Sequence, residues 1–432
     1  MITRISLASS LLFITILQAS PQKTITLAEC YEAATRKSAL AAEKDLHSSI
    51  WQIKDENLAK TWLPTLDAGA SLIYNSEMID LGEKFAAIPI PGLADAIKPL
   101  PHEQYKITLD ITQTLYDGGA TKAARTLENA SLKVNEKQTE TDLYKLRSQV
   151  NTYFFSILML DKQRESLEGF REVIDKRIAS MESALRNGVI LPSDIDVMRA
   201  EKLKLNQQLK DIEIKRNTML KILSDITGLT TGSDSRLITP EMMLPASPSL
   251  SRPELQSLDL RKEQLAAGIK LAGTKRLPKA YSFATLGFGN PPGNNFLKDE
   301  FAPYYILGAG IKWNIYDWNR VKNEKQIIAL EQNIIDKRKT DLEESLLRLL
   351  ESKKAEIASL ESQIDSDREL IELRKKISAA ATSQYENGII TATELLNELN
   401  AEHQAKVTHE LHNISLAMAK AEYMNISGEE IK

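Results

Sequence analysis

The sequence predicts a mixed α/β chain with an internal duplication, in which alternating strands lead directly into very long helices. Several segments of about ten residues alternate between apolar and polar side chains, which indicates strands with one apolar face. Residues 120–186 and 320–386 contain no proline, and short motifs recur at a constant spacing. Together these patterns predict two strands followed by a long helix, in each of two copies.

The duplication rests on three dipeptides that recur 200 residues further along the chain. They are Tyr116-Asp117 and Tyr316-Asp317, Asn187-Gly188 and Asn387-Gly388, and Thr227-Gly228 and Ser427-Gly428. From this order we expect a first structural repeat over residues 21–228 and a second over residues 252–428, each with a helix, two strands and a long helical hairpin. Residues 229–251, which are rich in Gly, Ser, Thr and Pro, are expected to form a linker.

Four strands are expected, at about residues 66–74, 105–115, 280–289 and 304–315. Alternation is regular in 105–115 and less regular in 280–289. Such a pattern also fits the short alternating strands of an outer-membrane barrel, but the alternation alone favours a half-buried sheet in a soluble protein.

Each second strand is followed by a helix of exceptional predicted length. The segment 120–186 contains only Gly169 as a helix breaker, and at 1.5 Å per residue it would extend about 100 Å. After Asn187-Gly188, apolar residues recur at alternating steps of three and four, as in a coiled coil. A helical hairpin that turns at Asn-Gly is therefore expected in each repeat.

Four strands cannot close a barrel, because single-chain barrels begin at about eight strands. An open sheet edge is not tolerated in lipid, where unpaired backbone groups cost several kcal/mol each. If the strands enter a membrane, several copies of the chain must share one barrel.

Composition excludes some functions and indicates export. A net charge of −4 without a basic cluster argues against nucleic-acid binding. Residues 1–20 have one charge, Arg4, then an apolar run and a small-residue exit, which is typical of a signal peptide. Cys30 is the only cysteine, so no intramolecular disulfide is possible, and we expect it to be partly buried.

Several segments together resemble one known family. They are "TITLAECYEAATRKSALAAEKDL", "LPTLDAGASLIY", "LYDGG", "ALRNGVILPSDIDVMRAE", "RPELQSLDLRKEQLAAGIKLAGTKRLPK", "WNIYDWNR" and "SQYENGIITATELLNELNAE". In this order and duplication, the chain resembles the outer-membrane efflux proteins of the TolC family over essentially its whole mature length.

The resemblance implies a homotrimer with a twelve-stranded transmembrane β-barrel, four strands per chain, continued by a long α-helical coiled-coil tunnel through the periplasm. It implies an outer-membrane exit duct of a tripartite efflux or type I secretion system, not an enzyme. Such a duct passively conducts substrates from a periplasmic adaptor (a membrane fusion protein) and an inner-membrane transporter to the outside. Outer-membrane lipid is a further expected partner. No cofactor, metal or catalytic residue is expected. An exported or soluble coiled-coil scaffold or adaptor with a small sheet insert remains the alternative.

The resemblance also assigns sites, all named here by their positions in this chain. The hairpin tips that contact the adaptor are Asn187, Gly188, Val189, Asn387, Gly388 and Ile389. The periplasmic entrance is formed by Asp194, Tyr385, Glu394 and Asn397. Ile390 and Asn397 replace an arginine and an acidic residue of the family pattern. The barrel-to-helix junction is formed by Tyr116, Asp117, Gly118, Gly119, Tyr316 and Asp317. Three Glu394 carboxylates in a trimer are expected to raise one another's pKa and to favour cations.

Overall fold

The chain forms two compact units, and each unit combines segments from both predicted repeats. One unit contains the residues up to Ser38, Lys145–Ser249 and Leu349–Lys432, and the other contains Ala39–Tyr144 and Leu250–Arg348. The computed structural model describes residues 24–431 except 79–100, 233, 246–248 and 296–297. The expected signal peptide, residues 1–20, lies outside the described residues, as do parts of both loops that connect the paired strands.

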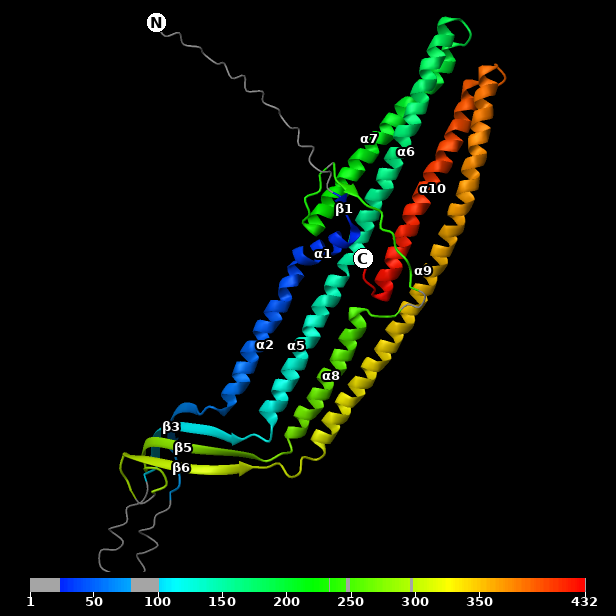
Figure 1. The fold of residues 1–432 in the computed structure, drawn as a ribbon. Coiled ribbons are helices and arrows are strands. Elements are labelled where there is room, and N and C mark those ends of the chain that lie inside the picture. The colour runs from blue at the N-terminus through cyan, green and yellow to red at the C-terminus, as the bar shows by residue number, and fades with distance from the viewer. Residues whose placement is uncertain (1–23, 79–100, 233, 246–248, 296–297, 432) are drawn as a thin grey trace, which may run out of the picture. The chain divides into compact units, whose positions relative to one another are not determined.

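A four-stranded antiparallel sheet belongs to the second unit. Its strands are β2 (Thr65–Tyr74), β3 (Glu103–Tyr116), β5 (Lys279–Asn290) and β6 (Ala302–Lys312), in the order β2-β3-β5-β6 (Figure 1). Each repeat contributes one hairpin, and β3 pairs with β5 to join them. Within the described chain, β2 and β6 therefore each have one unpaired edge.

The pairing register sorts the strand residues onto two different faces. One row across the sheet contains Leu66, Ile111, Ala284 and Leu307, and the next row contains Thr65, Thr112, Phe283 and Gly308. Because side chains alternate along a strand, the first row points to one face and the second to the other. We name them the apolar face and the polar face.

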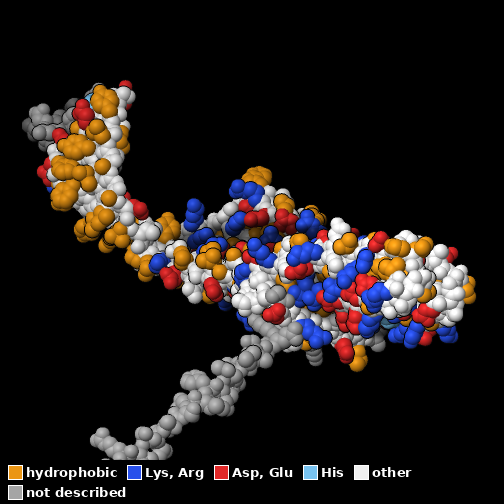
Figure 2. All heavy atoms as spheres, turned by 90° about the horizontal axis from the view of Figure 1, so that it is seen from above, with side chains coloured by type: hydrophobic (Ala, Val, Ile, Leu, Met, Phe, Trp, Pro, Cys, Tyr) orange, Lys and Arg blue, Asp and Glu red, His pale blue; other side chains and the backbone are white. Residues whose placement is uncertain are grey.

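The apolar face is exposed in the single chain. Leu66, Leu72, Leu307 and Ile311 have 62%, 77%, 71% and 78% of their surface accessible. Figure 2 shows hydrophobic side chains gathered at the sheet, whereas charged side chains are frequent on the helices. An exposed apolar surface of this kind marks a binding or membrane surface.

Four helices accompany the sheet in its unit: α2 (Glu43–Ala59), α5 (Ala120–Tyr144), α8 (Pro253–Thr274) and the first part of α9 (Arg320–Glu386). Helix α5 packs against both α2 and α8.

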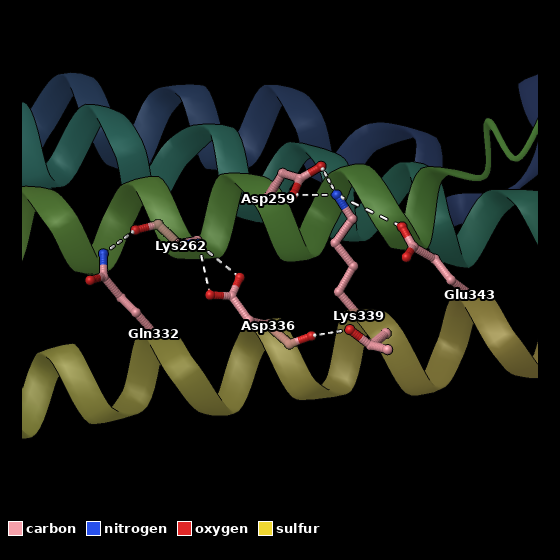
Figure 3. Close-up of polar contacts among 7 residues, drawn as sticks. Asp259, Lys262, Gln332, Asp336, Lys339 and Glu343 are labelled. Atoms are coloured by element: carbon pink, nitrogen blue, oxygen red, sulfur yellow. Dashed lines mark hydrogen bonds and ion pairs between the residues drawn. The ribbon is translucent and has the colours of Figure 1, made fainter.

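Polar contacts link α8 to α9 (Figure 3). Lys262 pairs with Asp336 at 2.8 Å, and Lys339 pairs with Asp259 at 2.8 Å. Gln332 Nε2 also donates to the Lys262 carbonyl at 3.1 Å. Because these pairs are partly exposed, each contributes only about 0–1 kcal/mol to stability.

The other unit contains α1 (Leu27–Lys37), α6 (Leu146–Arg186), α7 (Pro192–Thr227), α10 (Ala392–Ser427) and the end of α9. Its main core forms where α1, α6, α7 and α10 meet. The largest fully buried side chains there are Ile25, Leu27, Val150, Phe154, Phe155, Ile157 and Leu223. Cys30 is also fully buried, not partly buried as expected, and burial followed by the charge of Glu29 raises its pKa to about 12.

The expected linker is anchored to this unit by two contacts. Its strand β4 (Arg236–Leu237) pairs in parallel with β1 (Thr24–Ile25). The buried Arg216 Nε donates to Asp161 at 2.5 Å, and its Nη2 donates to the Ser235 carbonyl at 3.0 Å. The segment therefore has fixed attachments, which its Gly, Ser and Pro content did not indicate.

Two boundaries differ from the sequence expectations. The uninterrupted helix expected over 120–186 is broken at Lys145, which separates α5 from α6. Strand β6 ends at Lys312 and not at 315, because the following residues turn toward α9 and Trp313 Nε1 donates to the Arg276 carbonyl at 3.0 Å. Within the described ranges, no helix combines the length and apolar character needed to cross a bilayer.

Candidate functional site

Both helical hairpins turn by the same hydrogen-bonded motif. Gly188 and Gly388 have φ angles of 68° and 69°, which L-residues with a side chain rarely adopt. The next residue in each hairpin, Val189 or Ile389, donates back to Ala184 O at 3.0 Å or to Gln384 O at 2.9 Å. This is the Schellman ending of a helix, and it explains the repeated Asn-Gly.

The tips present apolar side chains to solvent. Val189 is 73% exposed and Ile389 is 70% exposed. A Cβ atom added to Gly188 or Gly388 would have no neighbouring atom within 4 Å. Substitution there would strain the backbone without a clash, so the bend and the exposed apolar tip can be tested separately.

The first turn after each tip is capped by an acidic residue at equivalent repeat positions. Asp194 Oδ2 accepts from the Leu191 backbone N–H at 3.0 Å, and Glu394 Oε2 accepts from the Thr391 N–H at 2.7 Å. Thr391 Oγ1 also donates to Glu394, and these bonds from Thr391 hold the pKa of the exposed Glu394 below its usual value. Both expected entrance acids therefore also stabilise their own helices. The raised pKa expected for Glu394 concerns a ring of three copies and stays a prediction.

Tyr385 and Asp194 come from different hairpins and lie close enough to interact electrostatically. Burial, and after it the negative charge of Asp194, raises the pKa of Tyr385. The described residues give the buried Tyr385 hydroxyl no hydrogen-bond partner. Arg177 beside it donates to Glu386 at 3.2 Å and to Thr382 at 3.3 Å. Asn397 is exposed.

Below the tips, the two hairpins share an apolar cluster. Its buried members are Phe170, Ile174, Met181, Ile195, Met198, Leu205, Ala381, Ala392, Leu395, Leu396 and Leu399. Beside it, the His403 ring stacks on Phe170 with centroids 4.4 Å apart. Burial, and after it the positive charge of Lys406, lowers the pKa of His403 to about 4.

The strand-to-helix junctions repeat one arrangement in the sheet unit. Asp117 Oδ2 accepts from the Thr121 N–H at 2.6 Å, and Asp317 Oδ2 accepts from the Val321 N–H at 3.0 Å. Both aspartates are buried and cap the helix that follows. Tyr116 and Tyr316 are 50% and 62% exposed.

The turn between cap and helix uses left-handed backbone in both junctions. Gly118 and Gly119 have φ angles of 68° and 80°, whereas Trp318 and Asn319 adopt 53° and 62°. The second junction therefore makes the same turn without glycine.

These groups form turns, caps and packed contacts. His412 Nδ1 lies 2.7 Å from Asp367 Oδ2, whereas His409 Nδ1 lies 4.0 Å from it. Across the described part of the chain, no group of three or more His, Cys, Asp or Glu side chains is arranged to hold a metal ion.

Residues 34–229 match the family described as outer membrane efflux protein. This segment belongs to the outer membrane efflux protein family. The family resemblance of the sequence is thereby confirmed, and it implies an outer-membrane location. No curated protein matches the sequence.

Solved outer-membrane channels share the efflux-protein fold along nearly the whole chain. The outer membrane protein VceC from Vibrio cholerae is 13% identical, with 94% of this chain and 97% of VceC covered and a TM-score of 0.65. CusC is 13% identical, with 94% and 92% covered and a TM-score of 0.69. The CmeC outer membrane channel of Campylobacter jejuni is 15% identical, with 93% and 85% covered and a TM-score of 0.62. At these identities the similarity concerns the fold.

Several residues with structural roles were not predicted from the sequence. The stacked His403, the buried Arg216 and the capping role of Asp194 were not expected. A signal existed for Asp194, because an acidic residue three positions after a helix start is a cap pattern. For His403 and Arg216, the deciding contacts come from residues far away in sequence.

Proposed function

We propose that this chain is the outer-membrane exit duct of a tripartite efflux or type I secretion system, built as a homotrimer. The observation that carries the proposal is a sheet with two unpaired edges and one exposed apolar face. Such a sheet is unsuited to water and equally unsuited to lipid as a single copy.

Pairing β6 of one copy with β2 of the next would satisfy both edges. Three copies give twelve strands, a closed barrel without edges, with the apolar face toward lipid and the polar face toward the channel. The helices that follow each strand pair would then form the periplasmic tunnel.

Aromatic residues at both ends of the strands support a membrane position. At the loop end, Phe301 stacks on Tyr105 at 5.4 Å and lies 5.9 Å from Phe288. At the helix end, Trp313 and Trp318 are 57% and 78% exposed. Girdles of aromatic side chains at the two interfaces are a feature of outer-membrane barrels.

The exposed tips fit contact with a periplasmic adaptor that is coupled to an inner-membrane transporter. We assign this contact to Asn187, Gly188, Val189, Asn387, Gly388 and Ile389, and the entrance to Asp194, Tyr385, Glu394 and Asn397. The pump and adaptor would then select the cargo, and the duct would conduct it passively.

Fractionation of the full chain tests the proposal against a scaffold protein. The duct should stay with outer membranes after a carbonate wash and migrate as a trimer before boiling. Leu307→Arg, on the apolar face, should abolish membrane retention, because a cation facing lipid costs about 2–4 kcal/mol at the midplane. Thr112→Arg, one row away on the polar face, is the control and should be retained. A wild-type chain found as a soluble monomer would contradict the proposal.

A further inference from the structure

Three aromatic rings on the polar face lie directly over glycines of the neighbouring strand. The register pairs Tyr281 with Gly310, Phe283 with Gly308, and Gly287 with Tyr304. A Cβ atom on Gly310 or on Gly287 would lie 2.8 Å from Cζ of the tyrosine, and one on Gly308 would overlap the Phe283 ring. The rings therefore occupy the space that a side chain would fill.

This arrangement is specific to the β5–β6 hairpin. On the same face, the β2–β3 hairpin pairs Thr65 with Thr112 and Asp67 with Asp110. Its Gly69 lies opposite Thr108, and an added Cβ would meet only Thr108 Oγ1, at 3.1 Å. Gly69 is thus a matched position on the same face without an aromatic neighbour.

The glycines decide where the rings point. A side chain on a strand stands roughly perpendicular to the sheet unless a neighbouring position leaves room for it to fold down. With a larger residue at Gly308, Phe283 could not lie against the sheet and would have to take a rotamer directed away from it. On the polar face, that direction leads into the space the proposed barrel encloses.

We propose that Gly287, Gly308 and Gly310 set the bore of the barrel section of the duct, because they let three large rings lie flat against its inner wall. The inference rests on the proposed function, in which the polar face lines the channel. Each glycine would occur three times at one height in a trimer, so a single substitution would raise three rings into the path together. Such a substitution would affect the transport of the largest substrates that the wild-type bore admits.

Single-channel recording of the full-length protein in planar bilayers tests this role. Gly308→Val should reduce conductance roughly twofold or more, since a ring of side chains at one height narrows a pore. Phe283→Ala in the Gly308→Val background should restore it, because no ring remains to be displaced. Gly69→Val should conduct like the wild type. Equal conductance of Gly308→Val and Gly69→Val would overturn the proposal, as would a double variant that stays narrow.

A second measurement separates this inference from the proposed function. If the wild type forms no channel, the proposed duct function and the proposed role of the glycines in setting its bore are both wrong. The contact between the rings and the glycines can still be tested. A double-mutant cycle of Phe283→Ala and Gly308→Ala, followed by thermal unfolding in detergent, should show clear coupling between the two sites. Additive effects would overturn the contact itself. Gly308→Ala replaces the valine variant here, because the smaller change leaves more folded protein.

Discussion

At the scale of single residues, the two junctions show one backbone turn made by different side chains. Gly118 and Gly119 occupy left-handed conformations that cost other residues about 1–2 kcal/mol each. In the second repeat, Trp318 and Asn319 adopt left-handed conformations despite this cost. The Trp318 ring packs edge-on to the Tyr316 ring, with the ring centroids 5.0 Å apart. The left-handed backbone alone therefore does not require glycine at both 118 and 119. One of the two positions needs glycine for a further reason.

That reason is space at Gly118. A Cβ atom there would lie 2.8 Å from Leu277 Cβ and 3.2 Å from the Pro278 carbonyl oxygen, whereas a Cβ atom added to Gly119 would meet no atom within 4 Å. Gly119→Ala should lower the free energy of unfolding by about 1–2 kcal/mol through φ alone. Gly118→Ala should lose a further 1–3 kcal/mol, roughly, through overpacking. Thermal unfolding of both variants in detergent measures the difference, and equal losses would contradict the packing argument.

His403 should make stability depend on pH. Its folded pKa of about 4 lies below the reference value of 6.5, so the unfolded chain binds the proton more readily. Titration of His403 should therefore leave the free energy of unfolding unchanged above about pH 6.5. This free energy should fall as the pH decreases from 6.5 toward 4. His403→Phe keeps the stacking on Phe170 and removes the titration. Chemical unfolding across this pH range should show a weaker dependence in the variant, and an unchanged dependence would argue against a buried, neutral His403.

At the scale of secondary-structure elements, the segment after α7 is attached through one buried guanidinium. Arg216 on α7 joins Asp161 on α6 to the Ser235 carbonyl, so a single side chain connects three parts of the fold. Removing one partner of a buried pair leaves the other charge uncompensated, at a cost of about 3–5 kcal/mol.

Arg216→Met should accordingly destabilise the helical unit by about 3 kcal/mol. Because Asp161 is partly exposed, the loss should lie at the lower end of that range. Arg216→Met combined with Asp161→Leu should recover most of the stability, since no unpaired charge remains. Urea unfolding compares the variants, and a single variant as stable as the wild type would exclude a bridging role.

The elements differ in how far the sequence could predict them. Alternation indicated a strand at 105–115, where the structure has β3 over Glu103–Tyr116. The irregular pattern at 280–289 has a physical cause, because Tyr281 and Phe283 occupy the polar face over glycines. The pairing of β4 with β1 was not predictable, since two-residue strands have no period and their partners lie far apart. The hairpin tips could be predicted from the Asn-Gly dipeptides, whereas the electrostatic interaction of Tyr385 with Asp194 depends on packing between hairpins.

At the scale of the whole molecule, the proposed trimer changes the setting of groups that are ordinary in one chain. Glu394 is an exposed cap residue here, and its pKa lies below the usual value because Thr391 donates to it. Three such carboxylates at a narrow entrance would attract cations.

Glu394→Gln should therefore move the reversal potential of the channel in a salt gradient toward zero. The amide still accepts from the Thr391 N–H, so the helix start should remain intact. Asp196→Asn removes an exposed carboxylate from the other hairpin and should have a smaller effect. Equal shifts in both variants would show that overall charge, and not the Glu394 ring, determines selectivity.

The free edges of β2 and β6 have a genetic consequence. In a closed ring of identical chains, every subunit must offer two sound edges. A subunit with a defective β6 would still join through β2 and would leave the cylinder unsealed. When such a variant is co-expressed in equal amounts with the wild type, it should spoil most assemblies, so its phenotype should be dominant.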